Sequence, residues 1–246
     1  MKKYIIGGSI LAVLITVLII SLLPKKEAIE VLFLSQSNYI LYEKDCQLSF
    51  IYFTNDPNYE LIDEYSAGFI ENEDQSLKFI VDQISQVKIH NEMFRGQTYY
   101  GYKIYVNLPD ITGSYYMEKL YLKLDTHGQS YHFFAGELFV EYQTGYDKLI
   151  PWTGLEGIKK TSPQLSQIIV DVSDYVQIDA VYIGPYLVTY FYGNNELIIH
   201  APEDTYLFNE TYVKIVTDMG ITYLPQFNYF SNYQLLISGY YSKHLI

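Results

Sequence analysis

The longest uninterrupted apolar stretch of the chain lies near its N-terminus and runs from Tyr4 to Leu23. It contains no charged residue and no proline. A helix of this length, at about 1.5 Å per residue, is about 30 Å long, which matches the hydrocarbon core of a bilayer. The stretch is longer than the apolar part of a cleaved signal peptide and ends without a small-residue cleavage site. The pattern therefore predicts an uncleaved signal anchor over residues 1–26.

Beyond the anchor, apolar residues alternate with polar ones, and many of the apolar residues are β-branched or aromatic. This period of two is typical of strands with one buried face. The clearest such segments are 47–53, 102–106, 119–124, 137–142 and 212–216. Residues that favour turns separate these segments at 55–58, 109–110, 127–128, 193–195 and 201–204. Many short strands with frequent turns indicate β-sandwiches.

We therefore predict an all-β fold, in which an N-terminal transmembrane helix is followed by two immunoglobulin-like β-sandwich domains. The first domain covers 27–150 and the second covers 164–246. Glycines, prolines and two lysines interrupt the strand pattern between them, which predicts a linker at 151–163. The pattern of residues 76–90 fits a helix and a hairpin of 78–82 with 86–90 equally well, so both interpretations stay open.

The charge distribution narrows the range of binding partners. All 28 acidic residues lie from Glu27 onward together with 12 of the 16 basic residues, so residues 27–246 carry a net charge of −16. Nucleic-acid binding needs basic side chains that neutralise phosphates, and this excess of acid argues against it. Lys2 and Lys3 together with the terminal amine slightly outweigh Lys25 and Lys26, which favours a cytoplasmic N-terminus and an extracellular C-terminal part. Cys46 is the only cysteine, so no internal disulfide can form.

The sequence contains no strong catalytic or metal-binding signature. Residues 125–132 (DTHGQSYH) hold two histidines and an aspartate that could converge on zinc or copper, but a solvated hairpin loop explains them better. Ser85-Gln86-Val87-Lys88 matches the Ser-x-x-Lys pattern of serine enzymes without the other motifs of that group. We therefore predict no catalytic residues, no metal, no cofactor and no enzymatic activity.

The chain is unusually rich in tyrosine, with 28 residues of this type. Adjacent residues on a strand point to opposite faces, so each tyrosine pair is expected to expose one ring. Exposed tyrosines suit protein interfaces and stacking on sugars. The clusters predict a partner-binding surface formed by Tyr99, Tyr100, Tyr102, Tyr115, Tyr116, Tyr229, Tyr240 and Tyr241. Within the anchor, the small residues Gly8 and Ala12 lie four apart and would let a partner helix pack closely.

These features together favour a single-pass membrane protein with a non-enzymatic function. Residues 4–23 would cross the bilayer of the cell membrane, and the extracytoplasmic part would dock on a membrane protein such as a transporter or secretion complex. The alternative is a cell-surface module that binds glycan or cell wall, in which tyrosines and Trp152 stack on sugar rings.

Overall fold

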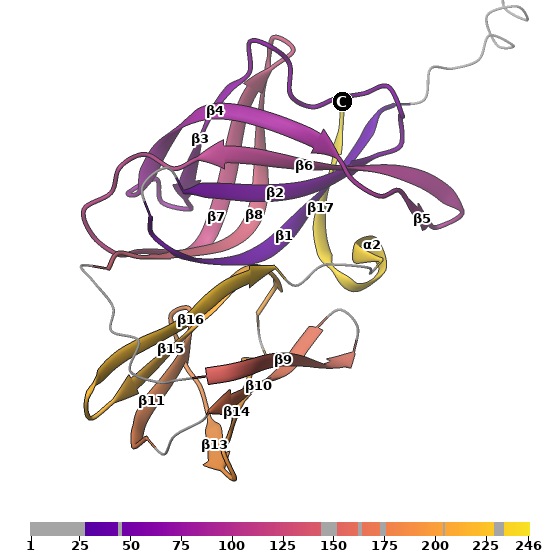
Figure 1. The fold of residues 1–246 in the computed structure, drawn as a ribbon. Helices are drawn as coiled ribbons and strands as arrows, with labels where there is room; N and C mark the ends of the chain where they lie inside the picture. Colours follow the sequence, from indigo (N-terminus) through magenta and orange to yellow (C-terminus); the bar gives the residue numbers. More distant parts are fainter. Residues whose placement is uncertain are drawn as a thin grey trace, which may run out of the picture.

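The computed structural model describes residues 28–43, 46–143, 152–161, 164–172, 176–203, 205–228 and 234–246. This part of the chain is almost entirely strand, so the all-β prediction is confirmed (Figure 1). Within it no helix is long and apolar enough to cross a membrane. The predicted anchor, with Gly8 and Ala12, lies outside the described residues, as does Tyr229.

The first half of the chain forms a sheet that closes on itself. Each strand of this ring pairs with the next, and the last pairs in parallel with the first. In the order of their pairing, the strands are β1 (Glu30–Leu41), β2 (Gln47–Thr54), β6 (Gln97–Asn107), β4 (Lys78–Lys88), β3 (Ala67–Asn72), β7 (Tyr115–Thr126) and β8 (Gln129–Glu141). The short β5 (Glu92–Phe94) adds to β6. Apolar side chains from all sides, among them Phe33, Phe50, Ile104 and Leu122, fill the interior of the ring.

The second half of the chain forms two layers below the ring in Figure 1. One layer is a separate four-stranded sheet of β13 (Tyr190–Gly193), β14 (Glu196–His200), β10 (Gln164–Val172) and β9 (Trp152–Thr161). The other continues the large sheet through β12 (Tyr186–Leu187), β11 (Ile178–Ile183), β15 (Leu207–Thr217) and β16 (Gly220–Asn228). A second apolar core, which includes Ile168, Val181, Leu197 and Val213, lies between the layers. This arrangement is sandwich-like.

The long strand β1 joins the two halves. Its first part pairs with β2, and its second part pairs in parallel with β8 and with β15. Residues 31–40 are all buried, because the ring interior covers one face, and an outer apolar cluster and the second core cover the other. The predicted division into two separate sandwiches did not anticipate this shared strand. The two halves therefore meet in one continuous sheet.

Two segments differ from their sequence predictions. Residues 78–88 form one strand, β4, and neither a helix nor a hairpin. A register shift between Asp82 and Ser85, with Gln83 at φ 54°, breaks the alternation and imitates a helical spacing. The predicted linker 151–163 instead forms β9 over Trp152–Thr161. Among the described strands of its sheet, β9 pairs only with β10, so it is an edge strand. An edge position tolerates glycines, and these glycines interrupted the alternating pattern by which the sequence analysis recognised strands.

The C-terminal strand β17 (Tyr240–Leu245) returns to the ring after the short helix α2 (Leu235–Ser238) and pairs with the first part of β1. Its attachment includes two titratable groups. Glu30 on β1 accepts hydrogen bonds from Lys243 and, at 2.8 Å, from the Tyr99 hydroxyl, and these bonds lower its pKa. The His244 ring packs against Phe133 at 4.6 Å between ring centres, and burial lowers its pKa.

From these two groups we predict that the free energy of unfolding falls in two steps as the pH is lowered. The unfolded chain binds a proton at His244 more readily than the folded chain, so stability decreases as pH falls below about 6.5. Glu30 contributes stability above its unfolded pKa, and this contribution is lost as pH falls from about 4.5 through the lowered folded pKa. Urea unfolding at pH 8, 5.5 and 3.5 measures both steps. His244→Gln should remove the first step and Glu30→Gln the second; unchanged steps in these variants would contradict the assignment.

Candidate functional site

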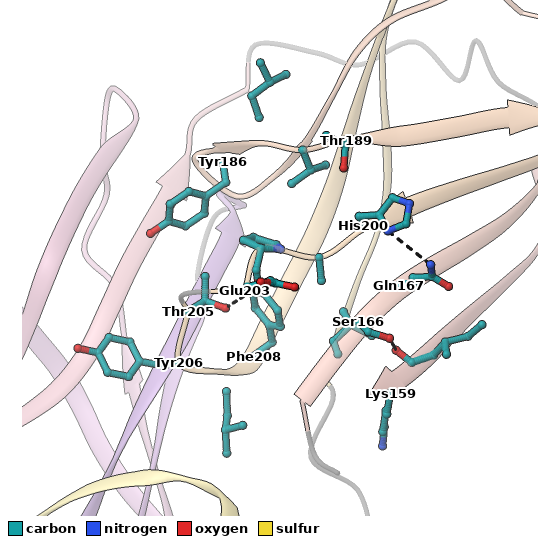
Figure 2. A pocket seen from close by; sticks show the side chains of 17 residues that line it. Lys159, Ser166, Gln167, Tyr186, Thr189, His200, Glu203, Thr205, Tyr206 and Phe208 are labelled. Carbon is teal, nitrogen blue, oxygen red and sulfur yellow. Dashed lines mark hydrogen bonds between the residues drawn. The ribbon is translucent and has the colours of Figure 1, made fainter. Parts of the chain in front are cut away.

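A concave site lies between the two layers of the second half. It is a pocket of about 1060 Å³ whose lining comes from β9, β10, the β12 turn, the loop after β14 and the start of β15. Figure 2 shows Tyr186 and Tyr206 on one side of this pocket and His200 and Gln167 on the other. Phe208, which is buried against Tyr39 at 5.6 Å between ring centres, also lines it. The pocket thus has an aromatic wall and a polar wall.

The polar wall is formed by side chains of the four-stranded sheet and of the loop after β14. Nδ1 of His200 lies 3.4 Å from the side-chain amide nitrogen of Gln167, which joins β14 to β10. The Ser166 hydroxyl donates to the Ile158 carbonyl at 3.0 Å. Lys159 and Glu203 add one charge of each sign to the lining. Among the described lining residues Glu203 is the only carboxylate, so they provide no acid–base pair of the kind that glycoside hydrolysis needs.

The aromatic wall is fixed by a buried carboxylate behind it. Oε2 of Glu137 on β8 accepts hydrogen bonds from the hydroxyls of Tyr186 at 3.0 Å and Tyr116 at 3.1 Å. Its Oε1 accepts from Ser37 at 2.5 Å and Tyr39 at 2.6 Å. Burial and then the nearby carboxylate raise the pKa of Tyr39, so its hydroxyl is protonated and donates at neutral pH. Four strands are held together at this one side chain.

A second carboxylate lies four residues further along β8. Glu141 accepts hydrogen bonds from the hydroxyls of Tyr212 at 2.5 Å and Tyr223 at 2.9 Å, and its Oε1 lies 2.6 Å from Nζ of Lys214. Burial first, and then hydrogen bonding to Glu141, raises the pKa of both tyrosines. Glu137 and Glu141 therefore fasten the ring to β12, β15 and β16, and so hold the elements that line the pocket.

A row of aromatic rings runs from the ring of strands to the pocket. Tyr121 on β7 lies 5.3 Å from Phe134 on β8, and Phe134 lies 5.8 Å from Tyr206, between ring centres. Tyr206 contacts Tyr240 on β17 at 5.8 Å. We call Tyr121, Phe134, Tyr206 and Tyr240 the aromatic row. Tyr240 is 59% exposed and the other three are partly exposed, so the row is open to solvent.

The predicted tyrosine surface is dispersed in the structure. Tyr116 and Tyr240 are exposed and lie next to the pocket and in the aromatic row, respectively. Tyr99 and Tyr102 are buried: Tyr99 donates to Glu30, and Tyr102 stacks on Tyr52. Tyr100, Tyr115 and Tyr241 are partly buried, and the last two pack edge-on against Phe79 and Phe94. Of the seven predicted tyrosines that the structure describes, Tyr116 and Tyr240 are the two that lie near the candidate site.

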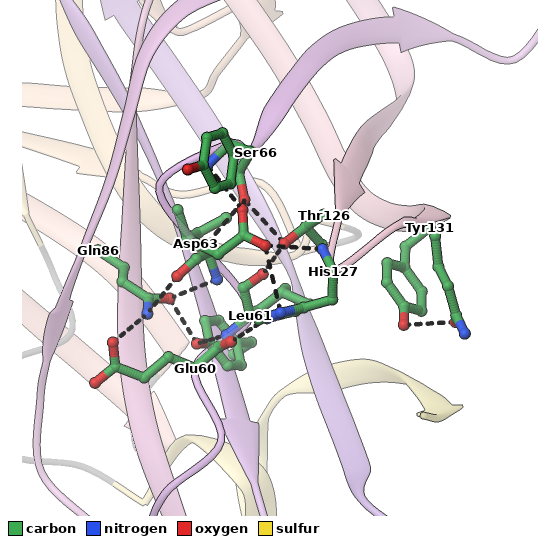
Figure 3. Close-up of polar contacts among 12 residues, drawn as sticks. Glu60, Leu61, Asp63, Ser66, Gln86, Thr126, His127 and Tyr131 are labelled. Carbon is green, nitrogen blue, oxygen red and sulfur yellow. Dashed lines mark hydrogen bonds and ion pairs between the residues drawn. The ribbon is translucent and has the colours of Figure 1, made fainter.

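The histidine candidates for a metal do not converge. His127 places its ring nitrogens 2.8 Å from the Glu60 carbonyl oxygen and 3.3 Å from Oδ2 of Asp63 (Figure 3). His132 stacks on Tyr121 and pairs with Glu71 at 3.2 Å. The described residues contain no group of three or more potential metal ligands. His127 instead ties the β7–β8 turn to the loop at 60–66.

The pocket residues were missed because they are scattered along the sequence. Tyr186 follows a Gly-Pro turn, while His200, Tyr206 and Gln167 each lie within ordinary strand or loop sequence. Only the packing of the two layers places them together. Comparison with known protein families finds none that matches the chain, and comparison with curated proteins finds no relative.

Proposed function

We propose that the chain is a non-enzymatic, membrane-anchored subunit whose extracytoplasmic β-part docks on a membrane protein such as a transporter or secretion complex. The aromatic row carries this proposal. Partly exposed tyrosine and phenylalanine rings are enriched at protein interfaces and often supply much of the binding energy. The row is assembled from β7, β8, β17 and the loop after β14, so it exists only in the folded protein.

The predicted anchor would place this surface near a membrane. In this proposal, residues 4–23 cross the cell membrane with the N-terminus in the cytoplasm, and β1 begins at Glu30, seven residues after Leu23. Seven extended residues span at most about 25 Å, so the start of β1 would lie close to the bilayer. Leu245 pairs with Glu30, so the end of β17 would lie there too. The net charge of −16 on residues 27–246 disfavours direct contact with anionic lipid and leaves a protein partner as the fitting occupant.

Purification from membranes in mild detergent tests this function. The full chain should fractionate with membranes and co-isolate another membrane protein in a fixed ratio. The double variant Tyr121→Ala/Tyr240→Ala should lower the recovered partner by at least about tenfold, because loss of two interface rings costs about 2 kcal/mol or more. Tyr65→Ala is the matched control, since Tyr65 is 82% exposed and lies outside the row. Recovery of the wild-type chain as a lone monomer, or in the soluble fraction, would count against the proposal.

A second candidate function is binding of a cell-surface or cell-wall glycan. The pocket between the two layers favours it, because aromatic residues and hydrogen-bonding side chains line one cavity. If the chain binds glycan, this pocket is the site at which we expect the ligand to bind.

A further inference from the structure

We infer that the pocket between the two layers is a binding site for a neutral oligosaccharide, with Tyr186 as the stacking platform and His200 and Gln167 as hydrogen-bonding partners. The inference goes beyond docking on a membrane protein and rests on the second candidate function. It assigns that function to one cavity and to one class of ligand.

The aromatic wall and the polar wall match the two kinds of surface that a sugar ring presents. A pyranose ring has an apolar face of C–H groups that packs on aromatic rings, and a rim of hydroxyls that donate and accept hydrogen bonds. Tyr186 and Tyr206 supply the rings on one side, and the imidazole of His200 and the amide of Gln167 supply polar atoms on the other. Ser166, Thr189 and Thr205 add hydroxyls to the lining. The hydroxyl and amide groups among them can both donate and accept hydrogen bonds.

The charge of the lining selects against other small ligands. Lys159 and Glu203 are the charged side chains among its described residues apart from the titratable His200, and their charges balance. An anionic ligand such as a phosphate ester would meet Glu203 without the cluster of basic groups that phosphate sites use. A purely apolar ligand would leave the amide, imidazole and hydroxyl groups of the polar wall without partners. A neutral, hydroxyl-rich ligand avoids both penalties.

The aromatic side chains Tyr186 and Tyr206 are held in position by contacts within the protein, without a ligand. The Tyr186 hydroxyl lies within hydrogen-bond distance of both Oε2 of Glu137 and the Tyr116 hydroxyl. Tyr206 is confined by edge contacts with Phe134 and Tyr240. A site whose side chains are already ordered loses little conformational entropy on binding. The volume of about 1060 Å³ lies at the upper end of the range for small-molecule pockets, which suits more than one sugar ring.

The test measures trisaccharide binding to the purified full chain. The chain is kept in a detergent without a sugar headgroup, and maltotriose, cellotriose and tri-N-acetylchitotriose are each titrated by isothermal calorimetry and by saturation-transfer NMR. At least one should bind saturably. Tyr186→Ala should weaken that binding at least tenfold and His200→Ala about three- to tenfold. Phe191→Ala, which removes an exposed ring outside the pocket, should leave it within twofold.

Several results would overturn the inference. These are no saturable binding of any trisaccharide, affinity unchanged in Tyr186→Ala, or binding only of a neutral peptide such as Gly-Ala-Ser-Gly-Ala-Ser. Near-UV circular dichroism of each variant establishes that it is folded, and Tyr186→Phe, which keeps the ring, should retain most of the binding. The membrane-partner test uses Tyr121 and Tyr240, which do not line the pocket, so failure of one proposal is distinguishable from failure of the other.

Discussion

Replacing Gly136 with alanine should lower the free energy of unfolding by about 3–5 kcal/mol. Gly136 lies on β8 where this strand runs in parallel with β1, and it has φ +100°. A Cβ atom there would lie 2.2 Å from the backbone oxygen of Gln36 and 2.5 Å from its nitrogen. Both contacts are with backbone atoms, which cannot turn aside as a flexible side chain would. The substitution should therefore separate β1 from β8 and open the ring.

Gly128, in the turn of the same β7–β8 hairpin, provides the control. It has φ +72°, and a Cβ atom there would meet nothing within 4 Å. Gly128→Ala should therefore cost only the backbone strain of about 1–2 kcal/mol. Urea unfolding of the detergent-purified full chain, followed by near-UV circular dichroism, measures both variants. Equal losses of stability would show that the approach of β1 to β8 is not what requires glycine at position 136.

Several of the strands that sequence analysis located have one buried face and one partly exposed face. Residues 102–106 and 119–124 alternate because every second side chain reaches a core, and they lie within β6 and β7. Strand β1 was not located: both of its faces are covered, and in its sequence a run of apolar residues is followed by a run of polar ones instead of alternating with them. Its centre, Ser35 to Asn38, is polar although it is buried. Those side chains bond to other segments: the side-chain oxygen of Gln36 accepts from the Ile51 amide, and that of Asn38 accepts from Asn209.

The candidate site could be predicted from the sequence less completely than the fold. In the pairs Tyr115–Tyr116 and Tyr240–Tyr241, adjacent strand residues point to opposite faces and the rings of Tyr116 and Tyr240 are exposed, whereas neither ring of the pair Tyr99–Tyr100 is exposed. Tyr102 obeys the same alternation, but its face is the ring interior, where it stacks on Tyr52. Which face becomes the core depends on the closure of the sheet. That closure rests on the contact between β1 and β8, which are about 100 residues apart in the sequence.

Glu137 is a second position where one substitution should have a large effect. Replacing it with leucine should cost about 3–5 kcal/mol of stability. The carboxylate accepts hydrogen bonds from Ser37, Tyr39, Tyr116 and Tyr186, and the first two of these residues are fully buried. A leucine of similar size cannot accept a hydrogen bond. Each buried hydroxyl left without an acceptor costs about 1–3 kcal/mol, whereas Tyr116 is 38% exposed and can turn toward water.

A graded series of variants separates this effect from a simple change of charge. Glu137→Gln keeps one oxygen acceptor, so its loss of stability should lie between those of the wild type and Glu137→Leu. Glu196→Gln, at the exposed start of β14, should change stability by no more than about 0.5 kcal/mol. Urea unfolding provides the free energies, and tyrosine absorbance reports the exposure of the rings. If Glu137→Leu unfolds at the same urea concentration as Glu196→Gln, the four hydroxyls find other acceptors and the carboxylate does not hold the two halves together. A large loss would show that the aromatic wall of the pocket and the junction of β1, β7, β8 and β12 depend on one side chain.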